Sequence, residues 1–119
     1  MTDALRACGA KVVASYVLAG GILSGKYAER GAGGRMAGEL DAPRWESALR
    51  AAAELRGLAD ELDATPAVLA MAFALANPEV ATILFGATRP EQIRENVAAA
   101  EVAEALTENQ LARLRAIGA

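Results

Sequence analysis

Two short apolar runs and several longer segments of helical spacing organise the chain. Residues 11–18 are apolar, rich in β-branched side chains and followed by glycines, which is typical of a buried strand. Residues 80–85 have the same character and stop at Gly86. Because both runs are apolar on both faces, the pattern predicts parallel strands covered by helices.

The segments of helical spacing differ in how deeply each should be buried. Residues 44–62 alternate apolar and charged positions, which predicts an amphipathic surface helix with Asp41 as its N-cap. Residues 66–76 are apolar nearly all round and follow a Thr65-Pro66 start signal, so this helix should lie in the core. The capping boxes at residues 88–91 and 107–110 predict helices over 88–100 and 107–117. Between these elements, residues 27–40 mix glycine with charge and predict a flexible loop.

The order of elements, strand, helices, strand and helix, predicts an α/β fold. A chain of 119 residues forms one domain at most. Two parallel strands alone leave long apolar edges open, so we expect further chain or a partner subunit to complete the sheet.

Composition and charge exclude several classes of function. The 54% hydrophobic content, in which alanine dominates, favours close-packed helices, and a net charge of −3 without a basic cluster argues against nucleic acid as a partner. Cys8 is the single cysteine and histidine is absent, so the sequence predicts neither a disulfide nor a metal site and fits the cytoplasm. The apolar run over residues 12–23 is too short to span a bilayer, and we expect no membrane association.

The first segment with candidate chemistry, residues 14–27, follows the first strand directly. Parallel sheets bind their ligands at the carboxyl ends of the strands. Glycines there allow a backbone to approach a diphosphate closely, and Lys26 could meet its charge. By spacing alone, the segment also fits a simple turn from strand to loop with a solvated lysine.

The second candidate segment, residues 86–96, follows the second strand. Thr88 is the predicted N-cap of a helix whose first N–H groups could hold an anion. Gln92, Glu95 and Asn96 stand at i, i+3 and i+4, which places them on one face where they could hydrogen-bond a purine and a ribose. By spacing alone, an ordinary capped surface helix fits as well.

Three sequence motifs favour a ligand site over these two structural alternatives. In order, they are Leu-Ala-Gly-Gly-Ile-Leu-Ser-Gly-Lys-Tyr, Gly-Ala-Thr-x-Pro-Glu-Gln-x-x-Glu-Asn and Leu-Thr-Glu-x-Gln-Leu. Together they resemble the last two strand–helix units of aldo-keto reductases, most of all the branch similar to potassium-channel β-subunits. The resemblance covers all but about the first ten residues and implies the C-terminal part of a (β/α)8 TIM barrel, whose full length is roughly 250 residues. It makes residues 1–119 a single partial domain, with strands seven and eight and a C-terminal helix.

The same resemblance implies an NADP(H) site. The backbone after the first strand and the Lys26 ammonium would lie along the pyrophosphate, while the second segment would hold the adenosine and its 2′-phosphate. Arg35 or Arg89 could add charge to a phosphate. The residues assigned to the cofactor in this way are Tyr16, Leu18, Ala19, Gly20, Lys26, Arg35, Gly86, Thr88, Gln92, Glu95 and Asn96.

The chain departs from the family at the nicotinamide end. The family has an aromatic residue followed by Ser-Pro-Leu, whereas here Tyr16 follows Ser15. In a regular strand, a shift of one residue sends the aromatic ring to the opposite face unless the backbone compensates. The family's catalytic Asp, Tyr, Lys and His belong to the first half of the barrel, so we expect no catalytic residue in this chain.

The sequence therefore predicts the cofactor-binding part of an NADP-dependent carbonyl reductase, a truncated barrel that is inactive alone. Its partners would be NADPH and either the N-terminal barrel half or a second copy of the chain. Two alternatives stay open: an interaction or regulatory module that oligomerises through open sheet edges, and a remnant that does not fold stably.

Overall fold

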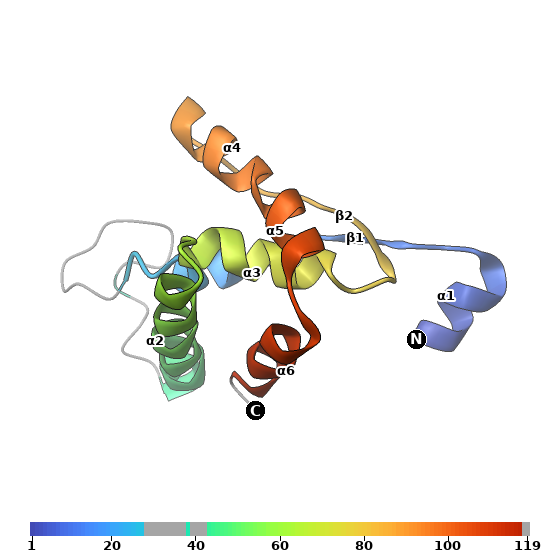
Figure 1. Ribbon diagram of the computed structural model, residues 1–119, viewed down its shortest axis with the longest axis horizontal. Helices are drawn as coiled ribbons and strands as arrows, with labels where there is room; N and C mark the ends of the chain where they lie inside the picture. The colour runs from blue at the N-terminus through green and yellow to red at the C-terminus, as the bar shows by residue number, and fades with distance from the viewer. Residues whose placement is uncertain (28–37, 39–42, 118–119) are drawn as a thin grey trace.

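The computed structural model describes residues 1–27, 38 and 43–117 (Figure 1). Arg35, Asp41 and most of the predicted loop lie outside the described residues. The elements in chain order are α1 (Thr2–Cys8), β1 (Val12–Ala14), the 3₁₀ helices η1 (Ala19–Ser24) and η2 (Pro43–Trp45), α2 (Glu46–Glu61), α3 (Pro66–Leu75), β2 (Val80–Ile83), α4 (Pro90–Val97), α5 (Ala99–Ala105) and α6 (Glu108–Ala116).

The strands β1 and β2 pair in parallel, as predicted, with Ala14 opposite Ile83. Both are shorter than the apolar runs suggested. β1 ends early because Tyr16 adopts a positive φ of 60°, which an extended strand does not accommodate. The Leu84 N–H still donates to the Ala14 carbonyl oxygen at 2.8 Å, so the segments that follow β1 and β2 leave the sheet side by side.

One face of this two-stranded sheet is covered and the other is open within the described residues. Ile83 packs against the buried cluster around Met71 and Ala72 of α3. On β1, Val13 is 56% exposed. In the described part of the chain, α3 is the helix that covers the strands, and it covers one face of the sheet.

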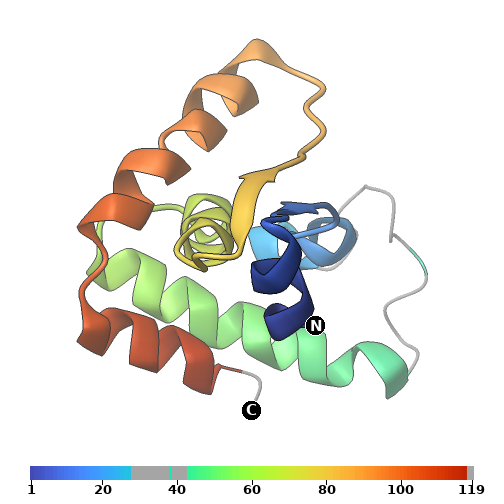
Figure 2. The same ribbon diagram turned by 90° about the vertical axis from the view of Figure 1, so that its right-hand side faces the viewer.

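The core lies around α3, as its apolar sequence predicted. Leu69 and Met71 are completely buried, and Leu55 of α2 and Leu114 of α6 pack with Leu69 in one cluster. The ribbon view of Figure 2 shows α2, α3 and α6 lying close together. The Thr65 hydroxyl oxygen accepts a hydrogen bond from the Val68 N–H at 3.3 Å, which is the predicted N-cap. Its apolar surface explains why this short helix forms the centre of the molecule.

The helix α1 was not predicted. It has no buried residue, so the sequence carries no apolar stripe that would indicate it. Its link to the body is the Arg6 guanidinium, whose Nε donates to Glu79 Oε1 at 2.7 Å, just before β2.

The predicted helix over residues 88–100 is in fact two helices. The turn tightens at Ala98, whose N–H donates to the Glu95 carbonyl oxygen, and α5 then continues in a new direction. In both views α4 stands away from the body while α5 lies beside α3 (Figures 1 and 2). No glycine or proline marks this break in the sequence. The terminal capping box is confirmed, because Thr107 and Gln110 exchange both hydrogen bonds at the start of α6.

Candidate functional site

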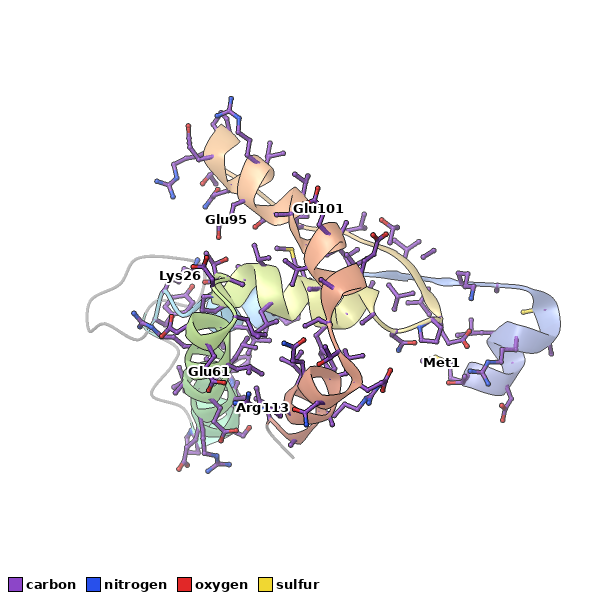
Figure 3. The ribbon with its side chains drawn as sticks, in the orientation of Figure 1. Met1, Lys26, Glu61, Glu95, Glu101 and Arg113 are labelled. Carbon is purple, nitrogen blue, oxygen red and sulfur yellow. The ribbon has the colours of Figure 1, made fainter. Side chains whose placement is uncertain are left out.

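A cleft of about 820 Å³ opens at the carboxyl ends of β1 and β2. Two segments form its sides, and they are named here the first wall (residues 16–26) and the second wall (residues 84–96). Figure 3 shows Lys26 of the first wall and Glu95 of the second on the same side of the molecule. The predicted residues that line the cleft are Tyr16, Leu18, Gly20, Lys26, Gly86, Thr88, Gln92, Glu95 and Asn96.

The first wall has an unusual backbone. Tyr16 and Ala19 adopt φ values of 60° and 49°, and Gly20 and Gly21 follow at 69° and 97°. A left-handed non-glycine residue costs about 1–2 kcal/mol, so packing must hold this conformation. Ile22 supplies that packing: it is 1% exposed and buried in a cluster with Tyr27 and Ala52. The predicted glycine-rich segment after the strand contains the 3₁₀ helix η1, which Gly20 and Gly21 interrupt with non-helical backbone.

Tyr16 lies in the lining of the cleft and is 58% exposed. The expectation that its ring would turn to the wrong face rested on the alternation of a regular strand. Because β1 ends at Ala14 and Tyr16 has a positive φ, this alternation does not determine the direction of the ring.

Lys26 folds back over Gly21. A Cβ atom built on Gly21 would lie 2.7 Å from Lys26 Cε and 2.9 Å from its Nζ, so a side chain at position 21 would collide with the lysine. The Lys26 ammonium also lies 4.9 Å from the centre of the Tyr27 ring, within the range of a cation–π interaction. Glycine at position 21 thus lets a cation rest against the backbone of the first wall.

Local hydrogen bonds organise the second wall. The side-chain oxygen of Gln92 accepts from the Thr88 N–H at 2.8 Å and from the Arg89 N–H at 3.1 Å. The N-cap of α4 is Arg89 rather than the predicted Thr88, and Gln92 is the residue that satisfies the free amides. The sequence misplaced the cap by one residue because Thr88 has the better capping side chain.

Asn96 is the buried residue of α4 and is 8% exposed. It lines the cleft, and its side-chain amide makes no hydrogen bond to any residue that the structure describes. An amide on the wall of a cleft that pairs with no described residue is free to donate to and accept from a ligand there. The prediction that Gln92, Glu95 and Asn96 share one face is confirmed, since all three border the cleft.

Among the described residues that were predicted for the site, Ala19 is not in this lining, because it packs against the cluster around Ile22. Arg35 lies outside the described residues. Several residues that do line the cleft were not predicted from the sequence. These are Val17, Gly21, Ser24, Thr65, Ala67, Leu84, Phe85 and Ala87. Thr65 was predicted only as a helix cap, because nothing in the sequence indicates that the start of α3 reaches the cleft.

Two kinds of feature are absent from the described part of the chain. Within residues 1–27, 38 and 43–117, no three His, Cys, Asp or Glu side chains lie together as metal ligands. The same residues include no helix of the length and apolar character needed to cross a bilayer.

The chain matches one protein family and is similar in sequence to three curated proteins. The sequence model of the Aldo/keto reductase family matches residues 1–119. A "Putative voltage-gated potassium channel subunit beta" from Schizosaccharomyces pombe is 37% identical over 105 residues, which are 82% of this chain and 30% of that protein. A "Probable voltage-gated potassium channel subunit beta" from Arabidopsis thaliana is 40% identical over 98 residues, 76% of this chain and 30% of that protein. A protein of the same name from Oryza sativa subsp. japonica is 35% identical, over 84% of this chain and 33% of its own length. The chain thus spans about a third of these curated relatives.

Proposed function

The chain belongs to the aldo/keto reductase family, and from this premise we propose that it carries the adenosine and pyrophosphate part of an NADP(H) site. The family implies a (β/α)8 barrel, and the two parallel strands with their helices are consistent with an incomplete one. In the proposal, they correspond to strands seven and eight.

The unpartnered amide of Asn96 is the observation that carries this proposal. A purine presents a ring nitrogen acceptor and an exocyclic amino donor side by side, and a side-chain amide can pair with both. Asn96 and Glu95 would contact the adenine edge, and the Gln92 N–H₂ group would reach the ribose. The Thr88 and Arg89 side chains at the start of α4 would meet the 2′-phosphate.

The first wall would hold the pyrophosphate. The glycines at positions 20 and 21 would let a diphosphate approach the backbone closely, and Lys26, whose side chain lies over Gly21, would bring the positive charge that it needs. When bound, NADPH supplies the hydride that reduces a carbonyl carbon. Here the chain's own residues bind and orient the cofactor, and we assign no catalytic residue among them.

Titration of the 119-residue chain with NADPH, followed by cofactor fluorescence, tests the proposal. Asn96→Ala should weaken binding about 10- to 100-fold, because one buried amide contact is worth about 1–3 kcal/mol. Asn109→Ala, an exposed asparagine of α6, is the matched control and should bind as wild type does. Adenosine 2′,5′-bisphosphate should compete, whereas nicotinamide mononucleotide should not. Equal affinities of the two alanine variants would contradict the assignment.

A second candidate function rests on the open face of the sheet. Val13 and Leu84 are 56% and 58% exposed, and β1 and β2 pair only with each other in the described part of the chain. Such a surface fits a non-catalytic interaction module that docks onto the other strands of a barrel or onto a second copy. Light scattering separates the two candidates: a stable oligomer that ignores NADPH favours the module.

A further inference from the structure

Thr65 stands where α3 and the second wall meet. Its hydroxyl group donates to Glu95 Oε1 at 2.7 Å and its oxygen accepts from the Val68 N–H at 3.3 Å. One hydroxyl thus caps the central helix of the core and also binds a carboxylate of α4. Thr65 itself lines the cleft.

This contact matters because little else fixes α4. Of its residues, only Asn96 is buried, and the helix stands away from the body (Figure 1). Glu95 is exposed, so its long side chain would otherwise sample several rotamers. Figure 3 shows Glu95 projecting from α4 toward the body of the molecule. The Thr65 bond leaves Glu95 Oε2 without a partner among the described residues. That oxygen is then available to a ligand in the cleft.

We propose that Thr65 is a positioning residue of the cofactor site: it orients the Glu95 carboxylate so that its second oxygen receives a donor of the adenosine group. The proposal rests on the proposed function, because it assigns a ligand to the same cleft. Thr65 acts through Glu95 rather than on the cofactor itself. It also sets the distance between the start of α3 and the second wall.

Two substitutions separate this role from helix capping. Thr65→Asp keeps a good N-cap for α3 but cannot donate to Glu95, and Thr65→Ser keeps both hydrogen bonds. We expect T65D to unfold at the same urea concentration as wild type and to bind NADPH about 5- to 10-fold more weakly. T65S should match wild type in both measurements. Thr65→Gly, which is tolerated as an N-cap, removes the donor without adding charge and should show a similar loss.

The double variant T65D/E95Q excludes simple charge repulsion. If the carboxylate introduced by T65D only repels the phosphates of the cofactor, T65D weakens binding equally with and without the E95Q substitution. If Thr65 acts through Glu95, the loss largely disappears in the E95Q background, because the amide N–H₂ introduced by E95Q can donate to the carboxylate introduced by T65D.

The outcomes are distinguishable. Wild-type binding with an unchanged affinity of T65D and T65G overturns the role of Thr65 and leaves the proposed function intact. An undiminished loss in T65D/E95Q also overturns it. A wild-type chain that does not bind NADPH overturns the proposed function, and the role of Thr65 falls with it.

Discussion

The two walls of the cleft are held in different ways. The first wall has left-handed backbone at Tyr16, Ala19, Gly20 and Gly21, and Ile22 anchors it from the buried side. The second wall has no residue of positive φ and is helical from Pro90 onward, and Gln92 closes the first turn of α4 with hydrogen bonds between near neighbours. Packing over long sequence distances therefore shapes one side of the cleft, and local hydrogen bonds shape the other.

This difference predicts which substitutions should disturb each wall. A change in the core should disturb the first wall and the whole fold together. A change at the start of α4 should loosen the second wall and leave the core intact, because local segments can open separately from the global transition.

The largest expected effect is that of Ile22→Ala. Removing most of a fully buried side chain should lower the free energy of unfolding by about 2–5 kcal/mol. Urea denaturation followed by the fluorescence of Trp45, which packs against this cluster, measures it. Ile93→Ala is the matched change on the second wall, where the side chain is 50% exposed, and should alter stability by about 0.5 kcal/mol. Similar losses in the two variants would erase the difference between the walls.

Gly21→Ala should have the next largest effect. Alanine at a φ of 97° is strained and its Cβ collides with Lys26, so we expect a loss of about 1–3 kcal/mol together with weaker NADPH binding. Gly57→Ala is the control, because Gly57 lies inside α2 with open space around it. That variant should be more stable by about 0.5–1 kcal/mol. A Gly21→Ala protein as stable as wild type would show that the first wall does not need its left-handed backbone.

Gln92→Ala tests the second wall. Loss of its oxygen removes the acceptor for the Thr88 and Arg89 amides, which should cost roughly 1 kcal/mol and act locally. Hydrogen exchange by NMR should show amides of α4 exchanging about 5-fold faster while those of α3 stay protected. Gln110→Ala removes the equivalent acceptor from α6 and should affect α6 alone. Faster exchange in α3 of the Gln92→Ala protein would contradict local control of this wall.

The smallest effect concerns an ion pair outside both walls. The two guanidinium nitrogens of Arg113 donate to the Glu61 carboxylate at 2.7 and 3.0 Å, linking α2 to α6 (Figure 3). This hydrogen bonding lowers the pKa of Glu61. A lowered folded-state pKa adds stability above the ordinary pKa of a glutamate, and that stability is lost as the pH falls through the lowered value.

Arg113→Met should therefore lower the urea midpoint slightly at pH 7 and not at all once Glu61 is protonated. Because the pair is exposed, added salt should shrink the difference at pH 7. A difference between wild type and variant that persists in strong acid would assign the effect to packing of the Arg113 side chain instead.

The sequence predicted the second wall better than the first, because local geometry determines the second wall and long-range packing determines the first. The spacing of Gln92, Glu95 and Asn96 follows from helix geometry, so their common face was predictable even though the cap was misplaced by one residue. The first wall depends on where Ile22 and Tyr27 pack, which no local pattern reveals. The glycines indicated a close backbone approach there but not the 3₁₀ helix.

The fold shows the same division. The central position of α3 and the parallel pairing of the strands follow from apolar patterns and were correct. The helix α1 buries no residue and its sequence signal is Gly9, its left-handed C-cap, which was missed, whereas the break at Ala98 has no glycine or proline to indicate it. Thr65 is the clearest example. Its capping role could be predicted from the sequence, whereas its contact with Glu95 could be found only in the folded structure.

The pairing of the strands also has a consequence for how the chain folds. Lys11 and Pro78, 67 residues apart in sequence, are joined at the start of the sheet by a hydrogen bond from the lysine ammonium to a carbonyl oxygen. Closing so long a loop is slow compared with helix formation, so we expect α2 and α3 to dock first and the strands to join late. In a kinetic experiment, substitutions at Val12 or Val80 should then speed unfolding more than they slow refolding. The cleft, which begins where both strands end, would be among the last parts of the molecule to form.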